Sequence, residues 1–305
     1  GHCLSRDCLV SPSRGQLLLT NELAVILRVA SFPTKVCAQS PEAFQCLLGR
    51  RAFARQMPSS HGFDAYCRKA EQGGTVERIC VALDVGLEMH DAFDARRPDG
   101  PTRLAVVLPA LRTWITQKSS LSTATTQWGL VVLRDAEAEL LLAPTERDIM
   151  LATLNSVAQP RRRDAFEEED DGVADAPFDF SSLYNVLGAA FGTARPDGAV
   201  DRCLVVFGRS RAVPVATGEF ELKNKGDFFL DAIYLHENAA PPVRDVQAVY
   251  DTLRKLLVHR SSYVMETTRS QEKLKSYLLL LLAHPVLRDA QDSALAKLDP
   301  EAAQR

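Results

Sequence analysis

The chain has 305 residues, of which 46% are hydrophobic and 25% charged, and its formal net charge is -3. This is the composition of an ordinary soluble globular chain, long enough for one domain of about 200 residues with extensions or for two small domains. Because nucleic-acid binders and binders of anionic membranes depend on clustered lysine and arginine, the near-neutral balance predicts no direct contact with either.

Residues 1–77 carry five of the seven cysteines and show no sustained periodicity beyond one helix at Gln16–Ala30. We expect a poorly ordered leader there. The cysteines form no C-x-x-C pair, which favours a reducing compartment. Neither the interrupted apolar stretch at 16–32 nor the short run Leu278–Leu282 is long and apolar enough to predict a membrane span.

A regular alternation of strands and helices begins after the leader. The pattern predicts strands at 78–84 and 128–133, a hairpin partner at 139–143, and helices at 102–117 and 145–157, with Pro144 in the first turn of the second helix. A loop at 159–177 follows, in which a run of arginines precedes a run of acids. Blocks of like charge favour a solvated loop, and a charged docking loop is the alternative.

The second half of the domain repeats the alternation. A short helix capped by Ser181 or Ser182 precedes strands at 202–208 and 228–235, and helices follow at 242–258 and 270–283. Continuous apolar strands that alternate with helices predict a doubly wound α/β domain at 78–288, whose mostly parallel sheet has helices on both faces and an antiparallel edge hairpin. Residues 289–305 are predicted to be a tail.

The turn after the first strand resembles a degenerate metal-adhesion turn. Asp84 stands at the carboxyl end of a buried strand, where open α/β sheets place their ligands. A divalent ion held by an Asp-x-Ser-x-Ser turn needs hydroxyls two and four residues later, and here those positions are Gly86 and Glu88. We expect no bound metal and no cofactor, since no glycine-rich phosphate loop occurs either.

An enzyme is the rival interpretation. The stretch around Ser210 (Gly-Arg-Ser-Arg-Ala) approximates a G-x-S-x-G elbow, and Asp231 with His236 or His259 follows in the order of an α/β hydrolase. The residues after Ser210 favour an extended exit rather than a helix, so we expect no catalytic residues.

The carboxyl end of the domain carries a more specific pattern. Residues 277–283 are apolar around the whole predicted helix, which indicates either a last core helix or a helix that fits a partner's groove. Pro285 ends this helix, and His284 before it is expected to be a cap or contact residue.

Three stretches resemble one family in order and spacing. They are Val81–Met89, Phe228–His236 and Leu281–Arg288, and they are similar to the von Willebrand factor A-like scaffold subunits of the BRISC and BRCA-A deubiquitinase assemblies. The similarity covers about residues 78–290. The leader and the short tail depart from the family's pattern.

The resemblance implies a von Willebrand A fold without catalysis, in assemblies of the cytoplasm and nucleus that act in the DNA-damage response and in signalling. The implied partners are a subunit built of ubiquitin-conjugase-like (UEV) domains and a JAMM-type metalloprotease that cleaves lysine-63-linked ubiquitin chains. The family's Pro-x-x-Arg segment corresponds to Pro285 and Arg288, so we expect partner contact at His284, Pro285 and Arg288. A von Willebrand A-like subunit of another intracellular complex is the alternative.

Overall fold

The computed structural model describes residues 76–122, 125–157, 177–192, 195–196, 198–215, 220–236, 246–256, 259, 261–268 and 270–298. The predicted leader, up to residue 75, and nearly all of the predicted charged loop lie outside the described residues.

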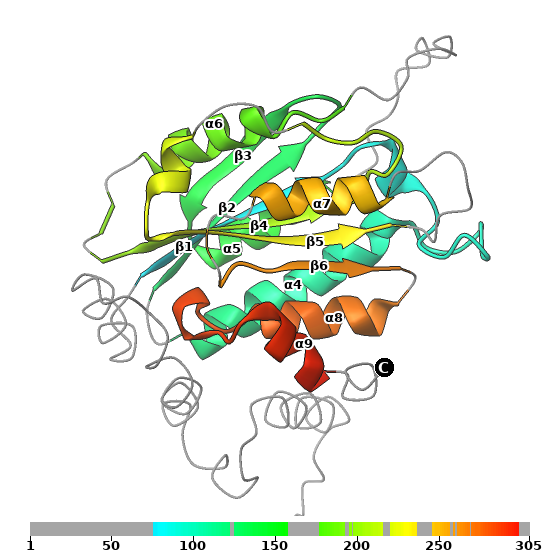
Figure 1. Cartoon of the computed structure of the whole chain (residues 1–305). Coiled ribbons are helices and arrows are strands. Elements are labelled where there is room, and N and C mark those ends of the chain that lie inside the picture. Colours follow the sequence, from blue (N-terminus) through cyan, green and yellow to red (C-terminus); the bar gives the residue numbers. More distant parts are fainter. Residues whose placement is uncertain are drawn as a thin grey trace, which may run out of the picture.

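One six-stranded sheet forms the centre of the domain (Figure 1). The strands are β1 Glu77–Asp84, β2 Thr126–Leu133, β3 Ala138–Thr145, β4 Val200–Phe207, β5 Phe228–Leu235 and β6 Val264–Thr267. They lie in the order β3-β2-β1-β4-β5-β6, and every neighbouring pair is parallel except β2 and β3. The predicted doubly wound, mostly parallel sheet with an antiparallel edge hairpin is therefore confirmed.

Helices connect the strands and flank the sheet. They are α4 Arg103–Leu121, α5 Arg147–Val157, α6 Phe180–Phe191, α7 Val246–Leu256, α8 Gln271–Leu280 and α9 Gln291–Leu298, with short 3-10 turns η2 Leu87–His90, η3 Glu221–Asn224 and η4 Pro285–Leu287.

Three local predictions were wrong. The side chain that caps α6 belongs to Asp179, which accepts from the Ser181 amide at 2.8 Å, and not to a serine. Pro144 lies in β3 rather than in the first turn of α5. The segment beyond residue 288 is not only a tail, because α9 forms within it.

The two faces of the sheet have separate hydrophobic cores. Side chains alternate along β1, so Ile79 and Val81 point to the face covered by α4, α5, α8 and α9, whereas Cys80 points to the face covered by α6 and α7 (Figure 1). Tyr277 and Leu278 of α8 belong to the first core, as the core-helix interpretation expected. Within the described part of the chain, none of the helices has the length and apolar character to cross a membrane.

Two glycines give a paired test of the packing. A Cβ on Gly129 of β2 would lie 2.7 Å from Cys80 Sγ and 3.0 Å from the Leu142 carbonyl oxygen, whereas a Cβ on Gly188 of α6 meets nothing within 4 Å. We expect Gly129→Ala to lower the free energy of unfolding in urea by about 2 kcal/mol through overpacking. The control Gly188→Ala is expected to raise it by about 0.5 kcal/mol because alanine favours the helix. Equal effects of the two changes would contradict this account of the core.

Candidate functional site

The loops after β1 and β4 meet where the strand order reverses. β1 pairs with β2 on one side and with β4 on the other, so the connections leave the sheet in opposite directions between β1 and β4. Ligand sites of open α/β sheets lie at this switch point. Asp84 ends β1 there, and residues 208–211 follow β4.

Both carboxylate oxygens of Asp84 are engaged by groups of the same chain. Oδ1 accepts from the Gly86 amide at 2.9 Å, and Oδ2 accepts from the Gly208 amide at 3.0 Å. The Arg209 guanidinium adds Nε and Nη2 contacts to Oδ1, at 3.0 and 2.9 Å. Asp84 is fully buried, so a positive charge beside it offsets the cost of burying the carboxylate.

Arg209 also ties this turn to the end of β2. Its Nη2 donates to the Leu133 carbonyl oxygen at 2.9 Å, and its Nη1 donates to the Asp135 carbonyl oxygen. The guanidinium lies over the Phe178 ring, 5.1 Å from its centroid. A Cβ at Gly86 would lie 2.9 Å from Arg209 Nε, so glycine is what leaves room for this arginine.

Glu88 stands where an Asp-x-Ser-x-Ser turn has its second serine, and it connects the turn to the loop after β4. Its Oε1 accepts from the Ser210 and Arg211 amides, at 2.7 and 3.0 Å. Arg103 of α4 lies 3.7 Å from Glu88 Oε2 and donates to the Gly208 carbonyl oxygen at 2.7 Å. Among the described residues, no cluster of three or more histidine, cysteine, aspartate or glutamate side chains could hold a metal ion. The turn is thus closed by charge pairs of the chain itself.

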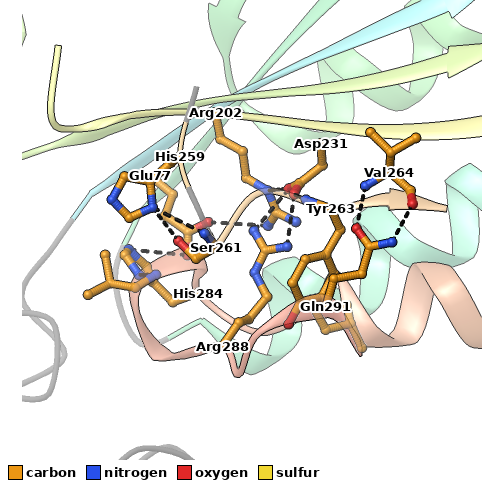
Figure 2. A network of polar contacts seen from close by, with 12 residues as sticks. Glu77, Arg202, Asp231, His259, Ser261, Tyr263, Val264, His284, Arg288 and Gln291 are labelled. Atoms are coloured by element: carbon orange, nitrogen blue, oxygen red, sulfur yellow. Dashed lines mark hydrogen bonds and ion pairs between the residues drawn. The ribbon is translucent and has the colours of Figure 1, made fainter. Parts of the chain in front are cut away.

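A second polar cluster holds the carboxyl-terminal segment against the sheet (Figure 2). Asp231, fully buried in β5, accepts from Arg288 Nη1 and Nη2 at 2.9 Å each, a two-point contact. Arg202 Nε of β4 and the Tyr263 amide also donate to Asp231, each at 2.9 Å. The opposing charges of Arg288 and Arg202 lower the pKa of Asp231, although burial alone would raise it.

Glu77 extends this cluster to α4 and to the segment after α8. Lys118 Nζ donates to Glu77 Oε1 at 2.6 Å and to the Leu282 carbonyl oxygen at 3.0 Å. Burial would raise the pKa of Glu77, but the charges of Lys118, His284 and Arg202 lower it to about 2. Burial lowers the pKa of His284 to about 4, so this imidazole is neutral at pH 7.

The residues predicted to touch a partner lie in this second cluster. Arg288 is 3% exposed and bonded to Asp231, Pro285 is buried in η4, and the His284 ring accepts from the Val286 amide, as the cap prediction expected. Contact with a partner stays a prediction, and in this arrangement the Arg288 guanidinium serves the chain's own Asp231.

In the described part of the chain the rival hydrolase residues have other partners, among them Glu266, whose Oε2 lies 3.4 Å from His236 Nε2. Ser210 is fully buried, and its hydroxyl bonds the Tyr234 hydroxyl at 2.9 Å. The partners of Asp231 are two arginines and a backbone amide, while His259 contacts the Ser261 hydroxyl at 2.6 Å. The serine and the aspartate therefore face different partners.

Sequence reasoning missed the second cluster, and one signal could have revealed it. Asp231 interrupts an otherwise apolar strand, Phe228–Leu235, and Arg202 stands in the apolar strand beside it. Charges at such positions need buried partners. The ion pair between Arg209 and Asp84 and the role of Arg103 were missed as well.

The doubly wound sheet, its antiparallel edge strand and the aspartate turn at the switch point form the von Willebrand A-like α/β fold that the sequence predicted. No protein-family profile matches the chain, and no curated protein matches its sequence.

The chain is similar to several solved structures. The von Willebrand A domain of SpRpn10 is 16% identical with a TM-score of 0.42, over 69% of this chain and 96% of that one. A von Willebrand factor type A protein from Catenulispora acidiphila is 13% identical with a TM-score of 0.39, over 70% and 43%. The PilB minor pilin from Streptococcus sanguinis is 9% identical with a TM-score of 0.44, over 71% and 62%.

Proposed function

We propose that the chain is a non-catalytic scaffold subunit of a lysine-63-specific deubiquitinase complex of the BRISC or BRCA-A type. In this role it holds a UEV-domain subunit and a JAMM-type metalloprotease together, in the cytoplasm and the nucleus. The observation that carries the proposal is the closed turn at the switch point, where Arg209 and Arg103 engage both carboxylates of a site that open sheets otherwise offer to ligands. The resemblance of the three sequence stretches supplies the particular complex.

The proposed partner surface lies beside the segment 284–288, whose backbone is held in place by contacts inside the domain. Arg288 anchors the segment to Asp231, and Pro285 begins η4, so both residues act by holding the backbone in place. Contact with the partner then falls to neighbouring exposed positions. Ala290 is exposed two residues after this segment and directly before α9.

An affinity pulldown tests the proposal. The intact chain is expected to recover the UEV-domain and JAMM-type subunits together with activity on lysine-63-linked ubiquitin. Ala290→Arg places a long charged side chain beside the proposed surface and is expected to reduce recovery about tenfold, or ~1.4 kcal/mol. Ala152→Arg, on an exposed position of α5, is the matched control and is expected to leave recovery unchanged.

Two results would contradict the proposal. If the intact chain recovers neither subunit, the scaffold role fails. If a serine-directed fluorophosphonate probe labels the chain and Ser210→Ala abolishes the labelling, the chain is a hydrolase instead. If Ala290→Arg and Ala152→Arg recover the two subunits equally, membership in the complex stands, and only the proposed partner surface beside residues 284–288 is contradicted.

A further inference from the structure

Three oxygen atoms from two strand ends converge on the Arg209 guanidinium. They are Asp84 Oδ1 at the end of β1 and the carbonyl oxygens of Leu133 and Asp135 at the end of β2. One carboxylate and two carbonyl oxygens are the kind of ligands that a hard divalent cation takes in proteins. Here the Arg209 guanidinium donates a hydrogen bond to each of the three oxygens.

We infer that Arg209 is the built-in cation of this turn, which holds the ends of β1, β2 and β4 in one arrangement that needs no metal ion. The guanidinium suits this role because its planar set of five donors reaches several acceptors at once. Its position over the Phe178 ring adds a cation-π contact. Only 13% of its side chain is exposed, so water screens these contacts little.

Gly86 leaves the space that the Arg209 guanidinium occupies in this turn. A serine, which an Asp-x-Ser-x-Ser turn has there, would bring a Cβ to 2.9 Å from Nε and 3.1 Å from Cζ of Arg209. Glycine and arginine therefore depend on each other. Gly86 and Arg209 fit together in this turn, whereas a side chain at position 86 would crowd the guanidinium.

This arrangement fixes the surface that the turn presents. Leu87, 53% exposed, follows Gly86 directly, and the exposed Arg211 donates its amide to Glu88 beside it. A turn held by a resident arginine keeps these side chains in place whatever the concentration of divalent ions.

A double-mutant cycle tests the inference, with melting temperature as the readout in EDTA and in millimolar Mn²⁺. Arg209→Ala leaves the buried Asp84 without its cation and is expected to lower the melting temperature by roughly 10 °C. Gly86→Ser is expected to lower it in the wild-type background but to add nothing in the Arg209→Ala background, because its clash partner is gone. Arg96→Ala removes an arginine whose side chain is 73% exposed and is the control, with little expected change.

The inference fails if the effects of Gly86→Ser and Arg209→Ala add, or if Mn²⁺ stabilises the wild-type chain and EDTA destabilises it. Where Arg209→Ala does not fold, Arg209→Lys serves in the cycle, since lysine keeps the charge but lacks the fork of donors. None of these measurements uses a partner, so they stand apart from the pulldown of the proposed complex.

Discussion

Replacing Asp231 by alanine is expected to lower the free energy of unfolding by about 4 kcal/mol, because the change leaves the Arg288 guanidinium without its buried counter-charge and Arg202 with only the more distant Glu77, at 3.9 Å. Arg202 and Arg288 are 0% and 3% exposed, so water does not replace the lost carboxylate. Urea unfolding gives the change in free energy. Limited proteolysis is expected to show earlier cleavage around residue 288, since Arg288 loses its anchor.

Asp148→Ala is the matched control for this prediction. The Asp148 side chain is 79% exposed and pairs with the half-exposed Arg147 next to it, so its removal is expected to change stability by less than about 0.5 kcal/mol. If Asp231→Ala were no more costly than Asp148→Ala, the buried cluster would not be what holds the carboxyl-terminal segment.

Acid is expected to destabilise the domain in two stages below pH 6.5. Burial lowers the pKa of His284 from 6.5 to about 4, so the unfolded chain binds this proton first as the pH falls, and stability drops between pH 6.5 and 4. The pKa of Glu77 falls from 4.5 to about 2, so its contribution is present above pH 4.5 and is lost as the pH falls from 4.5 toward 2. Each shift corresponds to about 3 kcal/mol.

His284→Asn separates the two stages. Asparagine can still accept a hydrogen bond from the Val286 amide, but it has no proton to gain in this range. Urea unfolding at a series of pH values is expected to show a flat profile for His284→Asn between pH 6.5 and 4.5 and the remaining loss at lower pH. A profile that still falls from pH 6.5 in this variant would mean that another group carries the first stage.

Periodicity made most of the sheet predictable, since its strands are continuous apolar runs. Two elements escaped for physical reasons. β6 has four residues and its Glu266 is exposed, which leaves too short a pattern to distinguish from a loop. α9 is short and follows Pro285, so it looked like a tail.

The sequence predicted where the turn at Asp84 lies in the sheet, but it did not predict which side chain occupies the turn. Asp84 at the end of a buried strand indicated the switch point, and the absent hydroxyls indicated a lost metal turn. What fills the turn comes from residue 209, and only the fold brings that arginine to Gly86. In the same way, the contact between Asp231 and Arg288 depends on the path of the chain through β6 and α8, which no local pattern specifies.

Gln291, the first residue of α9, sits at the outer edge of the sheet (Figure 2). Its side-chain amide accepts from the Val264 amide at 2.8 Å and donates to the Val264 carbonyl oxygen at 2.6 Å, which are the two bonds that a further strand would make at this residue. Unpaired edge strands are where chains join sheet to sheet and aggregate. The Gln291 side chain thus occupies the backbone amide and carbonyl of Val264, to which another strand would otherwise bond. Loss of α9, by truncation or by cleavage near residue 288, would leave the Val264 backbone groups unpaired and open β6 to pairing with a strand of another chain.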